Sequence, residues 1–435
     1  MSHNGPWRYE TRLMAVLCLT FGFVFFDRNA MSYLGPFVMK DLGLTYTQIS
    51  ALSSGLSFAF ALAALGVGYL SDRTGKRKSI LLTTVVVFSL CSALSGIAST
   101  FAILFMSRML MGLAEGGILP ISQSLIALES DEKRRGLNAG VMQNLGSNLI
   151  GSSIAPVVLV AIANTYHWRT AFYIAAIPGL VCAFLIWKFV REPQKQAIVP
   201  GAAKGATSVV ATPATTLAKN PSTPHAPVSD DKMTVLQMFR FRNIVLCGAM
   251  CCFMVAWMVL GWVFLPLVYE NFLHIPSGQA SWLMSLLGIS AAVFAFIVPG
   301  LSDKLGRKPV VVVFSLIGVL YPLAVLYYTG SAVLLGAIIF IGWSASGVFP
   351  IFMATIPSET IPAKYVATSL GLIVGIGEVV GGAFGPVLAG NLADRYGLQA
   401  PMYMAIVCAA VSGVIALGLK ETAPIKVGAA KLVVA

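Results

Sequence analysis

Twelve long apolar stretches constrain the fold of this chain more than any other feature of its sequence. A helix that crosses the hydrocarbon core of a bilayer needs about 20 mostly apolar residues. The stretches are 13 to 37, 47 to 71, 79 to 98, 100 to 127, 136 to 162, 170 to 190, 244 to 268, 279 to 302, 309 to 328, 332 to 357, 366 to 391 and 400 to 420. Only 11% of the residues are charged, against about 25% in soluble proteins. We therefore predict an all-α polytopic membrane protein with 12 transmembrane helices.

The positions of the basic residues predict how these helices are oriented. Lys and Arg are concentrated on the side of the two termini, whereas the opposite loops carry only Lys40, Arg169 and Arg395. Cytoplasmic loops are the ones enriched in Lys and Arg. We therefore expect a multi-pass protein of the plasma (inner) membrane with both termini in the cytoplasm. This topology explains the net charge of +12, so no nucleic-acid partner is expected.

A polar segment divides the stretches into two groups of six. From Pro193 to about Lys232 the chain is rich in Ala, Pro, Ser, Thr and Lys, with too few large apolar residues to bury a core. We predict a cytoplasmic N-terminal tail (1-12), a six-helix bundle (13-191), a flexible cytoplasmic linker (192-240), a second six-helix bundle (241-421) and a cytoplasmic C-terminal tail (422-435).

The two groups share sequence features at a fixed spacing. The loop after the second stretch, residues 68 to 78, reads GYLSDRTGKRK, and residues 302 to 308 read SDKLGRK 231 positions later. The same offset relates Gly140 to Gly371 and Gly151 to Gly382. Transporters built from parallel repeats bind substrate near the midplane between the halves and open to each side in turn. We predict two parallel six-helix repeats.

This loop resembles the GxxxDRxGxR signature of the major facilitator superfamily, whose members also have twelve spans and a long central loop. The resemblance implies the major facilitator fold and a cytoplasmic gate. The gating residues would be Gly68, Asp72, Arg73, Gly75, Asp303, Gly306 and Arg307. Glycine permits tight turns and close backbone approach, and basic residues can also anchor to anionic lipid. A plain cluster of topology-determining charges would explain the basic residues but not the repeated aspartate.

Ionisable residues within the apolar stretches mark a candidate centre. Five of them lie at similar depth: Asp27, Arg28, Arg108, Glu115 and Glu378. Arg108 and Glu115 are two helical turns apart and therefore share a face. A charge at bilayer depth costs a few kcal/mol or more, so it usually faces a partner or a watery cavity. One pair could be structural, but five groups from three spans favour a binding and coupling centre.

Uncharged polar residues are weaker candidates for substrate binding. Gln143 and Asn144 lie in the fifth stretch, and Ser344 and Ser346 lie in the tenth. Each could hydrogen-bond to a substrate, or could join neighbouring helices as polar residues in membranes commonly do. The sequence leaves both interpretations open.

Several of these residues resemble the anion:cation symporter branch of the superfamily, which includes bacterial sugar-acid permeases. The matching residues are Asp27-Arg28, Lys40-Asp41-Leu42-Gly43-Leu44, Gln48, Arg108, Gly112 and Glu115. The resemblance implies that Arg28 holds an organic anion while Asp27 and Glu115 carry protons. Phe25 stands where several sugar-acid members have Tyr, and Glu378 stands where many have Asn. These departures leave a smaller or more apolar carboxylate open beside a sugar acid.

We therefore predict a secondary active transporter that takes up a small organic anion with protons by alternating access. It should act as a monomer in the lipid bilayer, without a cofactor. The seven cysteines all fall in apolar stretches and form no metal-ligand pattern, so no metal is expected. A proton-driven exporter of drugs or metabolites is the alternative, but Arg28 and Arg108 disfavour it because an exporter needs no fixed cation. No P-loop, HExxH, GxSxG or dinucleotide fingerprint occurs, so an enzyme is not expected.

Overall fold

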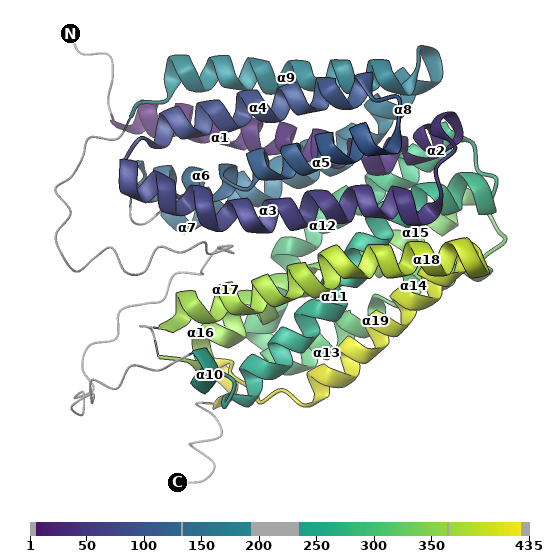
Figure 1. The fold of residues 1–435 in the computed structure, drawn as a ribbon. Helices are drawn as coiled ribbons and strands as arrows, with labels where there is room; N and C mark the ends of the chain where they lie inside the picture. Colours follow the sequence, from purple (N-terminus) through teal and green to yellow (C-terminus); the bar gives the residue numbers. More distant parts are fainter. Residues whose placement is uncertain (1–5, 132–133, 193–234, 363–364, 428–435) are drawn as a thin grey trace, which may run out of the picture.

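The part of the chain that the structure describes consists of helices and connecting loops. This computed structural model describes residues 6–131, 134–192, 235–362 and 365–427, and within them it contains no strand (Figure 1). Eleven helical runs there are long and apolar enough to cross a membrane. The remaining predicted span is occupied by α3 (Tyr46–Thr74), a helix of 29 residues. The predicted all-α polytopic fold is confirmed. Most of the predicted linker, and residues 1–5 and 428–435 of the predicted tails, lie outside the described residues.

The first six spans form one bundle. In chain order they are α1 (Pro6–Arg28) with α2 (Ala30–Leu42); α3; α4 (Arg77–Ile97); α5 (Phe101–Glu115) with α6 (Ile118–Glu129); α7 (Arg135–Gly140), η1 (Val141–Ile154) and α8 (Ala155–Thr165); and α9 (Trp168–Phe189). Because each span reverses direction, α1 begins and α9 ends on the same side of the bundle. We call this side the terminal side.

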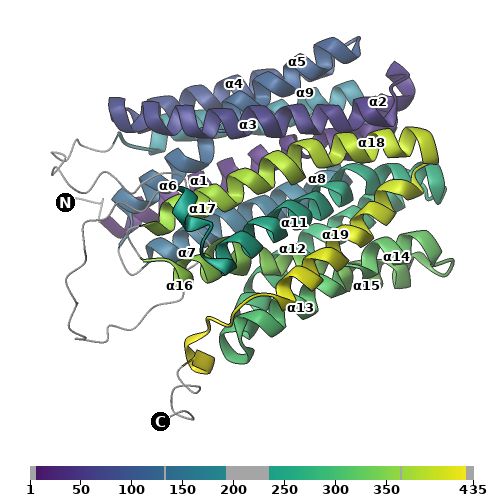
Figure 2. The same ribbon diagram turned by 60° about the horizontal axis from the view of Figure 1, so that its bottom comes forward.

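The second six spans repeat this arrangement. They are the short α10 (Val235–Met238), α11 (Arg242–Leu267) and η2 (Val268–Phe272); α12 (Ser277–Leu305); α13 (Arg307–Ile317) with α14 (Leu320–Tyr327); α15 (Ala332–Trp343), η3 (Ser344–Val348), η4 (Ile351–Thr355) and α16 (Ile356–Thr360); α17 (Val366–Gly377), η6 (Glu378–Phe384) and α18 (Gly385–Tyr396); and α19 (Gln399–Leu417). Figure 2 shows α11, α18 and α19 packed beside one another.

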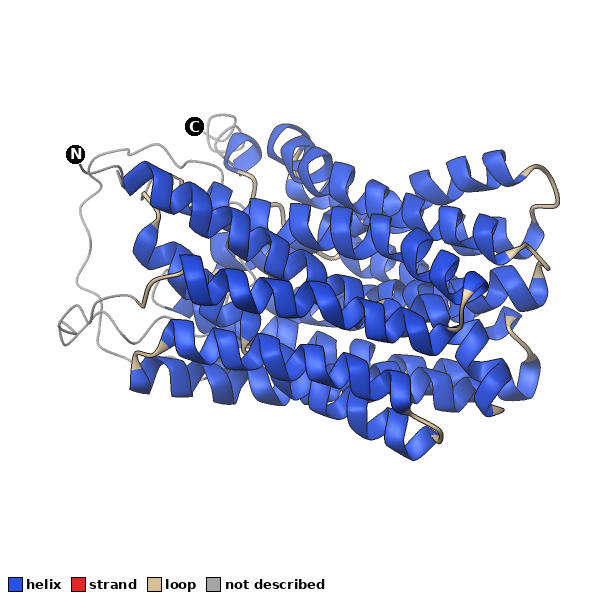
Figure 3. Cartoon of the chain, turned by 90° about the horizontal axis from the view of Figure 1, so that it is seen from above, coloured by secondary structure: helices blue, strands red, loops and turns tan. Residues whose placement is uncertain are grey.

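Several spans change helix type in their middle, where the sequence predicted uninterrupted helices. The first span breaks between Arg28 and Ala30, and the fourth breaks at Gly116 and Gly117. The fifth and eleventh spans each contain a π-helical segment, η1 and η6, within the otherwise helical chain seen in Figure 3. Such segments are frequent at functional sites, because they expose backbone groups and redirect side chains. The hydrophobicity of the sequence alone does not predict these breaks and π-helical segments.

Glycines bring the first and fifth spans, and the seventh and eleventh, into close contact. A Cβ atom on Gly146 would lie 2.6 Å from the carbonyl oxygen of Cys18, and one on Gly381 would lie 2.3 Å from that of Cys252. A Cβ on Gly151 would lie 2.4 Å from Cβ of Phe25. No larger side chain fits at such distances, and small residues are the usual means of close helix packing in membranes. The same packing in both halves agrees with the two predicted repeats.

The halves pack tightly against each other on the side opposite the termini. Asp394, near the end of α18, accepts hydrogen bonds from the backbone N–H groups of Tyr46 (2.8 Å) and Thr47 (2.9 Å) at the start of α3. A carboxylate is favourable at a helix N-terminus. Asn164 and Ser277 also exchange hydrogen bonds between the halves, at 2.9 and 3.0 Å. Direct polar contacts therefore hold this side closed.

On the terminal side, each half ties its third span to an acid that follows its sixth. Glu421 accepts a hydrogen bond from the backbone N–H of Arg307 at 2.8 Å, at the start of α13. Glu192 accepts one from the backbone N–H of Lys78 at 2.9 Å, at the start of α4. The two halves therefore use the same helix cap.

We expect Glu421→Gln to lower the thermal unfolding temperature at pH 7. Burial alone would raise the pKa of Glu421, but backbone N–H groups of Ala423, Arg307, Lys308 and Thr422 hold it below its usual value. The carboxylate therefore stabilises the fold above the unfolded-state pKa, about 4.3, and loses this effect as pH falls through the lower folded-state pKa. The difference between variant and parent should vanish over that window. A difference that is constant with pH would contradict this account.

We expect Asp394→Asn to loosen the closed side. Removing a charge-assisted contact of about 1.5–3 kcal/mol shifts the open population about tenfold or more. Spin labels can be placed at Tyr166 in the first half and Ser331 in the second half, which are both exposed on the side away from the termini. The distance between the two labels should increase in the variant. Asp41→Asn is the matched control, because Asp41 accepts a hydrogen bond from Arg169 (2.6 Å) within its own half. An unchanged distance distribution in Asp394→Asn would rule out the proposed closure.

Candidate functional site

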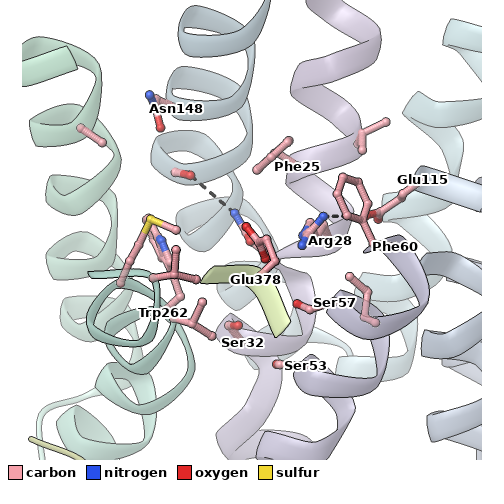
Figure 4. Close-up of a pocket in the computed structure, with 18 of the residues that line it drawn as sticks. Phe25, Arg28, Ser32, Ser53, Ser57, Phe60, Glu115, Asn148, Trp262 and Glu378 are labelled. Carbon is pink, nitrogen blue, oxygen red and sulfur yellow. Dashed lines mark hydrogen bonds and ion pairs between the residues drawn. The ribbon is translucent and has the colours of Figure 1, made fainter. Parts of the chain in front are cut away.

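A cavity of about 380 Å³ lies between the two halves. Its lining begins at Ser32 and Ser53, next to the closed side, and runs to Phe21 and Met353, nearer the terminal side. The first half contributes residues of α1, α2, α3, α5, α6 and η1, and the second half contributes mainly residues of α11, α12, the tenth span and the eleventh span. Figure 4 shows part of this wall. The cavity therefore begins beneath the contacts that close the opposite side.

Arg28 lies on the cavity wall and pairs with Glu115. Its Nη1 is 3.3 Å from Oε2 of Glu115, and the two side chains are 20% and 0% exposed (Figure 4). The guanidinium carbon also lies 4.7 Å from the centre of the Phe60 ring and 5.8 Å from that of Phe25. A guanidinium has five N–H donors in a planar fork. Arg28 can therefore present further donors to a second carboxylate in the cavity.

Asp27 and Arg108 are a second acid and a second base close to this pair. Both are fully buried, and their opposite charges interact electrostatically. Ser92 donates a hydrogen bond to Asp27 at 2.8 Å, and Arg108 donates one to Ser95 at 3.0 Å. The guanidinium of Arg108 lies 5.0 Å from the centre of the Phe172 ring. Arg108 reaches the cavity lining whereas Asp27 does not, so Asp27 can act on a ligand only through its neighbours.

Glu378 is the acid that the second half places on the cavity wall. It begins η6, and its side chain points into the space between the halves (Figure 4). The described part of the chain gives its carboxylate no hydrogen bond or ion pair, although its charge interacts with that of Arg28. With Asp27 and Glu115 it makes three carboxylates against two guanidiniums. The five predicted ionisable residues are thus near one another, with a net charge of −1 when all are ionised.

Three of the four predicted polar residues line the cavity. They are Gln143, Asn144 and Ser346. Among the described residues, Oε1 of Gln143 and Oγ of Ser346 are buried without a hydrogen-bond partner, so both are free to bind a ligand. Ser344 is also buried but is not part of the lining. Residues two apart on a helix do not share a face, so Ser346 faces the cavity in this conformation whereas Ser344 does not, and a substrate-binding role of Ser344 stays a prediction.

The second copy of the predicted gate contacts its own half. Arg307 pairs with Asp303 and, at 2.9 Å, with Glu359 at the end of α16. Gly306 has a positive φ of 106°, which glycine adopts without strain. In this conformation the contacts of Asp303 and Arg307 with other described residues lie within the second half.

The first copy of the gate lies at the terminal end of α3. Gly75 turns the chain toward α4 with a φ of 68°, and Arg73 is exposed. Gly68 and Asp72 belong to α3, but the surroundings of Gly68 and the side chain of Asp72 lie outside what the structure describes. The gating role of this copy stays a prediction.

Much of the uncharged cavity wall was not predicted from the sequence. Ser53, Ser57 and Phe60 line the cavity from α3, and Val255 and Trp262 line it from α11. Within each helix these residues are three, four or seven apart, which places them on one face. The periodic serines of α3 were a usable signal. Trp262 gave no such signal, because in the sequence an apolar residue on a cavity wall cannot be distinguished from one that faces lipid.

Comparisons with known proteins agree with this fold. Residues 17–265 and 245–432 each match the sequence model of the family described as Major Facilitator Superfamily. A "Probable 4-methylmuconolactone transporter" of Cupriavidus pinatubonensis is 26% identical over 87% of this chain and 82% of its own length. The "Hexuronate transporter" of Bacillus subtilis is 27% identical over 86% and 85%.

Among solved structures, a bacterial homologue of the human lysosomal transporter Spinster shares the fold. Its inward-facing, occupied form superposes with a TM-score of 0.77, at 16% identity, over 95% of this chain and 97% of that one. The relatives are transporters, as the resemblance to the anion:cation symporter branch implied. Both halves match the family model, and the chain therefore belongs to the major facilitator superfamily of membrane transporters.

Proposed function

We propose that this protein takes up a small organic carboxylate together with protons across the plasma membrane, as a monomer, by alternating access. The observation that carries the proposal is the Arg28–Glu115 pair on the cavity wall. A substrate carboxylate and the Glu115 carboxylate need the same guanidinium donors. A proton on Glu115 removes its charge and leaves Arg28 available to the substrate.

The charge balance of the cavity supports coupling to protons. The five ionisable residues carry a net charge of −1 when ionised, and a bound carboxylate would add another. Like charges repel strongly where water is scarce. Proton binding to Glu115, and to Glu378 or Asp27, offsets this repulsion. Anion and proton therefore favour each other's binding, which is the thermodynamic requirement for symport.

The distribution of basic residues supports cytoplasmic termini. In that orientation the contacts of Asp394 with α3 lie on the outer side, and the cavity lies beneath them. Uptake requires the contacts of Asp394 with α3 to break, so that the cavity opens outward and Arg28 meets the substrate there. A drug exporter would not need the cation at Arg28, which argues against that alternative.

We expect Arg28→Lys to weaken carboxylate binding by about ten- to a hundredfold. An ammonium cannot reproduce the bidentate, charge-assisted pair of a guanidinium, which is worth about 1.5–3 kcal/mol. Titration calorimetry should be run on purified protein with carboxylates selected by a thermal-shift screen. Arg169→Lys is the matched control, since Arg169 pairs with Asp41 at 2.6 Å outside the cavity. Equal affinity in Arg28→Lys and the parent would refute the assigned role.

We expect Glu115→Gln to separate exchange from accumulation. The amide mimics a permanently protonated Glu115, so the loaded carrier can reorient but cannot release this proton. Proteoliposomes should then exchange internal for external substrate yet fail to concentrate it under a proton gradient. Glu270→Gln is the control, because Glu270 lies in η2 and is not part of the cavity lining. Retained accumulation would move the coupling role to Asp27 or Glu378, and loss of exchange would mean that Glu115 supports the fold or the substrate directly.

A further inference from the structure

The two walls of the cavity differ in chemistry. The wall of the first half carries polar groups along its length, including Arg28, Asn29, Ser57, Gln143, Asn144 and Asn148. The wall of the second half is formed largely by Met258, Val259, Trp262, Val263, Phe349 and Met353. Apart from the tryptophan N–H groups, the polar side chains among the described lining residues of that half are Ser346 and Glu378. A ligand between the halves therefore meets one polar and one mostly apolar face.

The repeat explains how this difference arises. Pro36 corresponds to Pro266, near the end of the first span of each half, with an offset of 230 residues. The same offset makes Met258 the counterpart of Arg28 in the second repeat, and Met258 lines the same cavity. The offset of 231, which relates the N-cap residues Thr100 and Ser331 of the fourth and tenth spans, makes Ser346 the counterpart of Glu115. The charges of Arg28 and Glu115 therefore occur once, and their counterparts in the second half, Met258 and Ser346, are uncharged.

Trp262 is a fixed part of the apolar wall. Its ring meets those of Tyr33 and Trp343 edge-on, with centroids 6.4 and 5.2 Å away. Tyr33 is held in turn by a hydrogen bond to the carbonyl oxygen of Gly151 at 3.3 Å. A ring held in this way needs little ordering when a ligand packs against it, which favours binding of a flat apolar group.

A hydroxyl group placed against this wall would lose its hydrogen bonds to water without replacement. Such a loss costs about tenfold in affinity for each group. A polyhydroxylated sugar acid carries hydroxyls on all sides, whereas Ser346 and Glu378 can satisfy only one or two of them. An apolar body instead gains from leaving water. The apolar wall therefore favours carboxylates that carry an apolar body over those that carry many hydroxyl groups.

We propose that the substrate is a compact carboxylate with a flat apolar body, such as an aromatic acid. This inference rests on the proposed function, because Arg28 would hold the carboxylate while Met258, Val259 and Trp262 contact the body. Ser346 and Glu378 leave room for one polar substituent on the ring. The second half thus sets which organic anions are accepted.

Calorimetric titration of the purified full-length protein with three probes tests this inference. The probes are 4-hydroxybenzoate, cyclohexanecarboxylate and glucuronate. 4-Hydroxybenzoate should bind at least tenfold more tightly than glucuronate, and cyclohexanecarboxylate, whose apolar ring is not flat, should bind with an affinity between the two. Val259→Thr places a hydroxyl group in the wall at nearly constant side-chain size. It should lower the affinity for 4-hydroxybenzoate about three- to tenfold. Trp262→Leu should do the same, whereas Trp187→Leu, on an exposed side chain of α9, should leave all three affinities unchanged.

The outcomes separate this inference from the proposed function. Glucuronate binding that is as tight as that of 4-hydroxybenzoate, weakened by Arg28→Lys and unaffected by Val259→Thr, would overturn the inference and retain the function. If none of the three acids binds in a way that depends on Arg28, both fail. Because Val259→Thr changes size very little, the test does not depend on the folding of Trp262→Leu.

Discussion

Arg28 and Glu115 place opposite charges 3.3 Å apart inside the span of a membrane, where an uncompensated charge costs a few kcal/mol or more. The surrounding residues position and compensate these two charges. Gly146 and Gly151 hold α1 against η1, which fixes the depth and direction of Arg28. Asp27 and Arg108 lie close to it, where Ser92 donates a hydrogen bond to Asp27 and Arg108 donates one to Ser95. The first bundle therefore holds Arg28 in a fixed position, from which its guanidinium can pair with either Glu115 or a substrate carboxylate.

The second bundle supplies motion and selection in this account. It contacts the first half through Asp394 on the side away from the termini, and contacts of this kind can break at modest cost when the halves rock. It also covers the charged centre with an apolar wall around Trp262. In the proposed mechanism the binding energy of the anion and the proton shifts the balance between two packings of the same halves. Charge recognition and substrate shape are then determined by different bundles.

Much of the fold could be predicted from the sequence, because the requirement for long apolar spans leaves few alternatives. The charged centre could be predicted for the same reason, since Asp27 and Glu378 are conspicuous in apolar helices. Helix breaks at Arg28 and in η6 could not, because they depend on packing against neighbouring spans. The sequence left the roles of Ser344 and Ser346 open, and only the structure places Ser346 in the cavity lining. Trp262 was missed because its role depends on which helix face meets the cavity.

The central claim is that a substrate anion and Glu115 compete for Arg28, so that the anion binds together with a proton. Titration calorimetry in several buffers of different ionisation enthalpy measures the protons taken up per anion bound. At a pH where Glu115 is ionised in the free protein, the account predicts net proton uptake by the parent and a smaller uptake, by about one proton, in Glu115→Gln. Binding of the anion to the parent without proton uptake at any pH would contradict it.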